Sequence, residues 1–156
     1  MYGQELLTQS EKNQIAEAVE TIKKIGNKNA ERYNGWENRE TWALSLGVSN
    51  WQSLYEDILG IAQRNWERNK KNIHVGMVSS TANEIKSYLE NDVLGYDNIS
   101  AWNERLIREG SKDVEYDNKP WVIRQEVGSL WRVDYRAIAE HYLEIAKEIT
   151  ERENGI

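Results

Sequence analysis

Residues 33–42 read Tyr-Asn-Gly-Trp-Glu-Asn-Arg-Glu-Thr-Trp, and the rest of the chain is interpreted outward from them. Asn34-Gly35 is a dipeptide typical of a turn. Asn38 is suited to cap a helix that begins at Arg39, because its side-chain oxygen can accept from a free backbone N–H of the first turn. The stretch therefore predicts a turn followed directly by a helix.

Residues 42–48 leave two interpretations open. Trp42 and Leu46 are four apart, as on one face of a helix. Leu44, Leu46 and Val48 alternate with other residues, as in a strand. Because a helix cap precedes the segment, we favour a short buried helix.

Apolar residues recur at spacings of three and four in three longer segments, which predicts helices. The first is an amphipathic helix over 11–25 that is capped by Ser10 and should end at Gly26. The second, over about 51–68, is expected to be the central helix of the fold. The third follows an Asp134 cap and runs nearly to the end of the chain.

Two shorter helices are predicted between the second and the third. Ser79 or Ser80 is expected to cap the first of them, which Gly95 would end. Ser100 is expected to cap the other, which would run to Gly110. Both assignments depend on a serine that directly precedes an apolar periodic segment.

Two further segments have open alternatives. Residues 73–78 alternate in polarity and could form a short strand. Pro120 suits the first turn of a helix that Gly128 interrupts, whereas residues 122–127 also fit an edge strand. We favour the helix after Pro120.

These segments together predict a mostly α fold, with a single compact bundle of six or seven short helices over 1–156. A minor short β-hairpin is the alternative for one part of it, and residues 1–9 are expected to be loosely ordered. A chain of 156 residues can bury one core. It has seven Trp, eight Tyr and no Phe, so the aromatic rings of the core carry polar groups that need partners.

Several classes of site are excluded or have no motif. The chain contains no Cys, so it can form neither disulfides nor Cys-ligated metal sites. We find neither a Gly-rich phosphate loop nor a nucleophile elbow. The first residues lack the basic and apolar regions of a signal peptide, so none is expected, and no apolar run approaches the roughly 20 residues that a membrane span needs. We therefore expect a cytoplasmic protein without a cofactor.

His141 is accompanied by Glu144 and Glu148 on the last predicted helix. Metal sites in helical bundles draw their ligands from several helices, whereas these two acids fall on the predicted solvent face. No metal site is therefore expected. An enzyme with an acidic or histidine site is the least favoured of the functions considered.

Asp113, Glu115 and Asp117 alternate in the most loop-like stretch of the chain. An extended backbone would carry all three on one side, but the spacing lacks the glycine and the distal Glu of an EF-hand loop. Residues 79–156 also hold the whole net charge of -6. This acidity either serves solubility or forms a face for a basic partner.

Arg64, Arg68, Lys70 and Lys71 cluster at the end of the central predicted helix. Cations at that position complement the helix dipole. The alternative is a surface that faces nucleic acid, beside which an exposed Trp could stack on bases.

Any single Trp can fill the core or anchor a partner, because interface hot spots favour Trp, Tyr and Arg. Trp36 lies in the predicted turn, outside the helical periodicity, and is the best candidate for a special role. The charged pair Arg39 and Glu40 is expected to form a salt bridge inside the fold, with a binding role as the alternative.

The box from Asn34 to Trp42 resembles one shared by small proteins of bacteriophages, mobile elements and cyanobacteria, with the pattern Asn-Gly-Trp-x-Asn-[Arg/Tyr]-Glu-Thr-Trp. Leu54-Tyr55 matches the usual helix start after that box. Residues 133–140 are similar to the C-terminal pattern Val-Asx-aromatic-Arg-x-Ile-Ala-Glu of the same group. The resemblance implies a genetic setting of phage or mobile DNA, in which small accessory proteins often bind and inhibit host defence machinery.

The leading hypothesis is a non-enzymatic helical protein that binds a host or viral protein, as an inhibitor of anti-CRISPR or anti-restriction type. Its partner would be a nucleic-acid-binding effector whose basic surface meets the acidic second half of the chain. The alternative is an accessory protein that binds nucleic acid directly. The residues predicted to contact a partner are Trp36, Arg39, Trp42, Asp113, Glu115 and Asp117. The residues that would face nucleic acid are Arg64, Arg68, Lys70 and Lys71.

Overall fold

The computed structural model describes residues 8–31, 35–68 and 72–155. The chain divides into two units, 1–37 and 38–156, and each is described by itself. All regular structure in the described residues is helical and includes eight α-helices, so the predicted mostly α fold is confirmed. The β-hairpin does not occur in this part of the chain, and the prediction of one domain over the whole length stays a prediction.

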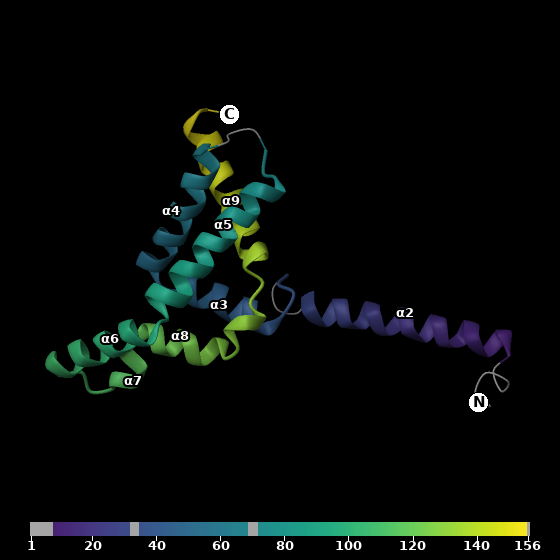
Figure 1. Ribbon diagram of the computed structural model, residues 1–156, viewed down its shortest axis with the longest axis horizontal. Helices are drawn as coiled ribbons and strands as arrows, with labels where there is room; N and C mark the ends of the chain where they lie inside the picture. The colour runs from purple at the N-terminus through teal and green to yellow at the C-terminus, as the bar shows by residue number, and fades with distance from the viewer. Residues whose placement is uncertain (1–7, 32–34, 69–71, 156) are drawn as a thin grey trace. The chain divides into compact units, whose positions relative to one another are not determined.

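The first unit contains helix α2, Gln9–Glu31 (Figure 1). A reciprocal pair of hydrogen bonds starts it. The N–H of Glu11 donates to Oγ1 of Thr8 at 3.1 Å, and the N–H of Thr8 donates to Oε1 of Glu11 at 2.9 Å. These bonds lower the pKa of the Glu11 carboxyl. Thr8 is therefore the cap, and the predicted cap Ser10 lies in the first turn.

The prediction that Gly26 ends this helix is wrong, because α2 continues to Glu31. One glycine inside a helix costs only about 1 kcal/mol relative to alanine, which the flanking helical turns can offset. Of residues 1–9, which were expected to be loosely ordered, 1–7 lie outside the described residues, whereas Thr8 and Gln9 form the start of α2.

Three helices form the core of the second unit: α4 (Gln52–Arg68), α5 (Val75–Ser87) and α9 (Tyr135–Glu153). Each packs against the other two (Figure 1). Their inward side chains are apolar and almost fully buried, which confirms the central and the last predicted helices. These side chains are Leu54, Ile58, Ala62, Ile85, Ile138, Tyr142 and Leu143.

Two predicted helix starts are confirmed. The side chain of Asp134 caps α9 and accepts from the N–H of Ala137 at 3.2 Å. Pro120 lies in the first turn of α8 (Lys119–Val127), so the helix is correct here and the alternative edge strand is wrong. Gly128 follows α8 with a φ of 76°, a conformation that favours glycine.

The start of α5 differs from the prediction. Nδ1 of His74 accepts from the N–H of Met77 at 3.2 Å, so His74 caps the helix. Ser79 and Ser80 both lie inside α5. The strand considered for this segment is therefore wrong, because its alternating residues belong to the end of a connector and the first turn of a helix.

A π-helical turn, Tyr88–Val93, continues α5 and is followed by α6, Tyr96–Arg108. Gly95 stands at the junction. A Cβ atom added there would lie 2.3 Å from the main-chain oxygen of Asn91, so the junction requires glycine. Ser100, the predicted cap of this helix, lies within α6.

The short helix α7, Val114–Asp117, replaces the extended segment that was predicted. Asp113 caps it, and its Oδ1 accepts from the N–H of Tyr116 at 3.1 Å. Because the backbone is helical here, the three acids of this segment do not share one side of a strand. α7 connects α6 to α8, and α8 packs against α3, Arg39–Ser49.

Within the described residues, no helix combines the length and the apolar character that crossing a membrane requires.

Candidate functional site

Residues 38–42 hold α3 against the segment that leads into α9. Asn38 caps α3 as predicted, with its Oδ1 accepting from the N–H of Thr41 at 2.9 Å. Nδ2 of Asn38 donates to the main-chain oxygen of Arg132 at 2.8 Å. The buried hydroxyl of Thr41 accepts from the N–H of Asp134 at 2.8 Å. The box therefore has a structural role in fixing where α3 begins.

Arg39 and Glu40 contact different parts of the fold. Nη1 and Nη2 of Arg39 donate to the main-chain oxygens of Glu126 and Val127, both at 2.8 Å. These are the last carbonyls of α8, which have no partner inside that helix. Glu40 lies 3.9 Å from Nε of Arg132. The arginine near Glu40 is thus Arg132, whose side chain is 55% exposed, and not Arg39, as was expected.

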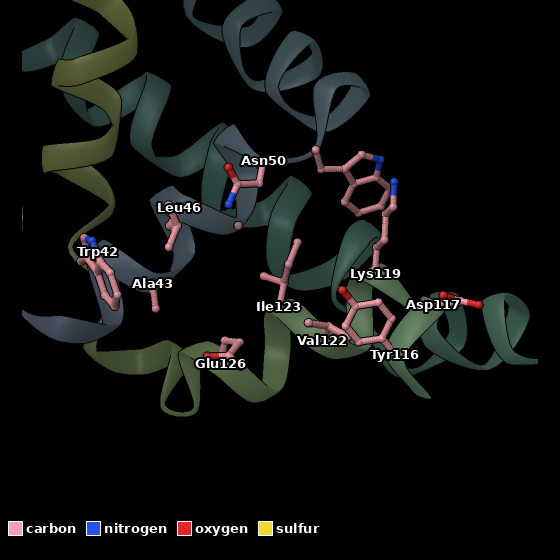
Figure 2. Close-up of a pocket in the computed structure, with 12 residues that line it drawn as sticks. Trp42, Ala43, Leu46, Asn50, Tyr116, Asp117, Lys119, Val122, Ile123 and Glu126 are labelled. Atoms are coloured by element: carbon pink, nitrogen blue, oxygen red, sulfur yellow. The ribbon is translucent and has the colours of Figure 1, made fainter. Parts of the chain in front are cut away.

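A groove lies between α3 and α8 and extends to α7 (Figure 2). Its volume is about 460 Å³. Its middle is apolar, with Ala43 and Ile123 buried and Leu46 43% exposed. Gly47 allows the two helices to approach closely, since a Cβ atom added to it would lie 3.0 Å from Cγ1 of Ile123.

Aromatic side chains lie at both ends of the groove. Trp42 stands at one end and Tyr116, which is 76% exposed, at the other (Figure 2). Trp51 also lines the end near Tyr116. The Trp51 ring packs edge-on against Trp102, with 5.4 Å between the ring centroids. Nζ of Lys119 lies 5.6 Å from the centroid of the Trp51 ring.

Charged side chains accompany this apolar surface. Glu126 lies toward the Trp42 end, and Asp117 and Lys119 lie toward the other (Figure 2). Asp117 accepts from the hydroxyl of Ser111 at 2.8 Å. A concave surface with an apolar middle and a charged rim can bind apolar side chains and orient them by charge.

Two of the residues predicted to contact a partner, Trp42 and Asp117, line this groove, toward opposite ends. The others do not line it. The guanidinium of Arg39 binds the end of α8, Asp113 caps α7, and Glu115 is exposed on the same short helix. The structure thus joins one residue of the box and one of the acidic segment in a single surface.

Trp36 belongs to the first unit, 1–37. Gly35 precedes it in a turn with a φ of 85°, as predicted, whereas Asn34 of the predicted turn lies outside the described residues. The side chain of Trp36 is half-buried.

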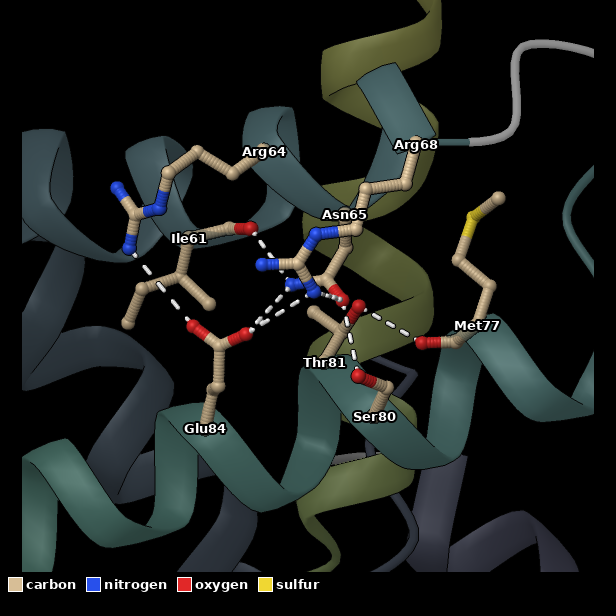
Figure 3. Close-up of polar contacts among 8 residues, drawn as sticks. All are labelled: Ile61, Arg64, Asn65, Arg68, Met77, Ser80, Thr81 and Glu84. Carbon is tan, nitrogen blue, oxygen red and sulfur yellow. Dashed lines mark hydrogen bonds and ion pairs between the residues drawn. The ribbon is translucent and has the colours of Figure 1, made fainter.

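Arg64 and Arg68 lie beside a carboxylate of α5 (Figure 3). Oε2 of Glu84 is 3.7 Å from Nη2 of Arg64, and Oε1 is 3.7 Å from Nη1 of Arg68. This pairing offsets part of the positive charge, but the side chains of Arg64 and Arg68 are 61% and 64% exposed and stay at the surface. Lys70 and Lys71 lie outside the described residues.

Asn65 is buried beneath these arginines and uses both ends of its amide (Figure 3). Nδ2 donates to the main-chain oxygen of Ile61 at 2.9 Å and to Oε1 of Glu84 at 3.2 Å. Oδ1 accepts from the hydroxyl of Ser80 at 3.0 Å and from Arg68 at 3.4 Å. These hydrogen bonds join α4 to α5, so the buried polar atoms of Asn65 stabilise the packing of the two helices.

A second cavity, of about 540 Å³, is polar and lies beside the π-helical turn. The hydroxyl of Tyr88 donates to Oδ2 of Asp57 there at 2.6 Å. Burial and the neighbouring Asp57 carboxylate raise the pKa of Tyr88 to about 12. The pair therefore acts as a structural hydrogen bond near neutral pH.

Burial lowers the pKa of His141. In the part of the chain that the structure describes, no three His, Cys, Asp or Glu side chains are grouped as a metal site.

Sequence reasoning missed most of the groove, although one signal for it exists. Lys119, Val122, Ile123 and Glu126 are spaced as one face of a helix, and all four line the groove. The helical spacing was not decisive, because Val122, Ile123 and Glu126 belong to the segment 122–127, which also fits an edge strand.

Asn118 was also missed. Its buried side chain caps α8 by accepting from the N–H of Trp121 at 3.3 Å. Its Nδ2 donates to the main-chain oxygen of Ile99 at 3.0 Å and to Oδ1 of Asn103 at 2.8 Å. Asn118 thereby fixes the start of α8 against α6 and positions one end of the groove.

Comparison of the chain with models of protein families, with curated proteins and with solved structures found no match. A proposal about function therefore rests on the groove and on the sequence patterns already described.

Proposed function

We propose that this protein is a non-enzymatic binding protein that docks on another protein through the groove between α3 and α8. The observation that carries this proposal is the apolar middle of the groove, where Leu46 is 43% exposed between Trp42 and Tyr116. Covering apolar surface is favourable by about 25 cal/mol per Å². Trp and Tyr are also residue types that dominate the energetics of protein interfaces.

The charges near the groove support a partner with a basic surface. Asp117 and Glu126 line the groove together with one cation, Lys119, and Asp113 and Glu115 are exposed nearby on or beside α7. Complementary charge raises the rate of association and suppresses wrong partners. Proteins that bind nucleic acid present such basic surfaces.

The setting of the proposed activity comes from the resemblance of the box to proteins of phages and mobile elements. We propose that the protein works in the cytoplasm of the host cell and inhibits a defence effector of CRISPR or restriction type. The groove and the acids beside it would occupy a surface on which the effector binds nucleic acid. The proposed inhibition of a defence effector is inferred from the genetic setting of the similar proteins, and not from the helical fold.

Capture of a partner by matched variants tests the proposal. Leu46→Glu places a charge in the middle of the groove, whereas Ile107→Glu places the same charge on α6, where Ile107 is 65% exposed. We expect the native chain and Ile107→Glu to recover one stoichiometric protein from host lysate, and Leu46→Glu to lose it. Equal recovery by both variants, or no stoichiometric partner, would overturn the proposal.

A further inference from the structure

A small cavity lies between the start of α4, the π-helical turn and α6, and its volume is about 180 Å³. One water molecule needs roughly 10–15 Å³, whereas pockets for drug-sized ligands begin at roughly 300 Å³. The cavity therefore has room for one small chemical group, such as the end of a side chain, and not for a whole cofactor.

Three aromatic side chains line this cavity: Trp51, Tyr88 and Trp102, all of them half-buried. The two indole rings stand at 87° to each other with 5.4 Å between their centroids, so together they form a corner. The face of an aromatic ring carries negative charge and attracts cations, most strongly in Trp. Walls of this kind suit a ligand that is both positively charged and partly apolar.

Two carboxylates line the same cavity, those of Asp57 and Asp92. Oδ2 of Asp57 accepts from the hydroxyl of Tyr88 at 2.6 Å. A carboxylate offers about four acceptor positions, so Asp57 can accept from a ligand as well. Asp92 acts on the same phenol, because the pKa of Tyr88 is raised by burial first and then by both carboxylates. Negative charge thus adjoins the aromatic walls.

The surroundings of the cavity remain negative. In the described part of the chain, neither Lys nor Arg lines it. Three of its lining residues also line the larger polar cavity, to which Glu56, Glu84 and one cation, Arg64, belong. Arg64 and Arg68 each lie 3.7 Å from Glu84. Four carboxylates therefore stand against two arginines among these described residues.

The chain itself shows that an indole of this cavity stacks with a guanidinium. Cζ of Arg105 lies 4.3 Å from the centroid of the Trp102 ring. Arg105 does not line the cavity, and its Nε lies 3.8 Å from Oε1 of Glu109. Arg105 therefore demonstrates the pairing without filling the site.

A guanidinium is the cation that uses both kinds of wall. Its planar face stacks on aromatic rings, and its N–H groups pair with carboxylates. A quaternary ammonium has no N–H to donate to the two aspartates. Metal ions such as Ca²⁺ take six to eight oxygen ligands, and the described residues contain no group of three His, Cys, Asp or Glu that could hold one.

We propose that this cavity binds a guanidinium group, that of an arginine side chain on the partner protein. The guanidinium stacks in the indole corner and donates to Asp57 and Asp92. Trp51 lines both this cavity and the groove between α3 and α8, so the two sites adjoin. The partner as the source of the arginine rests on the proposed function, whereas the guanidinium site itself does not.

Titration of the ¹⁵N-labelled full chain with acetyl-arginine methylamide tests the site, with the indole N–H signals as the readout. We expect saturable shifts of the Trp51 and Trp102 signals. Acetyl-citrulline methylamide has nearly the same shape without the charge and should cause none. Acetyl-lysine methylamide should bind more weakly, because an ammonium lacks the planar fork. No saturable shift with the arginine compound, or equal binding of either analogue, would overturn the guanidinium site.

Two variants that lose the same charge show whether the cavity is where the compound binds. Asp92→Asn removes a carboxylate of the cavity, whereas Glu104→Gln removes one from an exposed position on α6. We expect Asp92→Asn to weaken binding about tenfold, as for the loss of one charged acceptor. Glu104→Gln should change it by less than about twofold at physiological salt, which screens exposed charges. Equal weakening by both variants would overturn the proposal.

Free arginine distinguishes a small-molecule ligand from a side chain of a protein. The blocked compound has uncharged ends, like a residue within a chain, whereas the α-carboxylate of free arginine would stand beside acids. We expect free arginine to bind no more tightly than the blocked compound. Tighter binding would assign the cavity to a small molecule and overturn the partner as the source. Since these titrations use no partner, their failure overturns the guanidinium site alone, whereas failure to capture a partner overturns the docking role of the groove.

Discussion

Nη2 of Arg39 donates to the main-chain oxygen of Val127 at 2.8 Å, and this contact joins the start of α3 to the last residue of α8. Nη1 of the same guanidinium binds the neighbouring carbonyl of Glu126. The walls of the groove belong to these two helices. Arg39 therefore helps to hold the two walls of the candidate binding surface together without lining it.

Arg39→Ala should lower the free energy of unfolding by about 1–3 kcal/mol, because it removes two hydrogen bonds from a charged donor. Arg39→Lys should recover only part of this loss, since an ammonium lacks the planar fork that binds two carbonyls. Urea denaturation measures both effects. An Arg39→Ala protein as stable as the native one would contradict the role of this contact.

Asn65→Ala should destabilise the second unit by about 1–3 kcal/mol, because it removes the buried partner of Ser80 and Glu84. Asn83→Ala is the matched control, since Asn83 is exposed on α5. Equilibrium denaturation should separate the two variants. Equal stability of both would show that the buried network contributes nothing.

Gly95→Ala should destabilise the protein by about 1–3 kcal/mol, because its Cβ atom would meet the main-chain oxygen of Asn91 at 2.3 Å. Gly60→Ala should have the opposite sign. Gly60 lies inside α4, where the atom nearest to an added Cβ is the flexible end of Arg64 at 3.6 Å. The gain there should be about 0.4–1 kcal/mol. Thermal unfolding of the pair checks both signs.

The hydrogen bond between Tyr88 and Asp57 predicts a pH dependence. The pKa of Tyr88 is raised to about 12 from 10.0, so the folded state holds the phenolic proton more tightly than the unfolded state. The resulting stabilisation is complete below pH 10 and is lost as the pH rises through 12. Burial also raises the pKa of Tyr135 and of Tyr142.

The difference in unfolding free energy between native protein and Tyr88→Phe isolates this contribution from that of the other tyrosines. We expect the difference to be constant from neutral pH to about pH 10 and to shrink at higher pH. Denaturant titrations at a series of pH values measure it. A difference that is independent of pH up to 12 would contradict the raised pKa.

Features that depend on a few adjacent residues could be predicted from the sequence. Asn38, Asp134 and Pro120 mark helix starts through their own side chains or ring, and the structure confirms all three. His74 was missed because histidine seldom caps a helix. The continuation of α2 past Gly26 was missed because a local stop signal was outweighed by the helix on both sides.

The groove could not be predicted because it depends on contacts between distant segments. Trp42 and Asp117 were both proposed to contact a partner, but only the packing of α8 against α3 brings them to one surface. The partners of Arg39 lie 87 and 88 residues away in the chain. Sequence spacing within one helix carries no information about such pairs.

Site-specific photo-cross-linking from position 46 tests the binding role of the groove most directly. A photoreactive phenylalanine analogue would replace Leu46 in one variant and the exposed Ile107 of α6 in a control. We expect one host protein to be linked from position 46, at an apolar segment flanked by basic residues, and not from position 107. Equal linkage from both positions, or linkage from position 107 alone, would contradict the assignment of the groove as the binding surface.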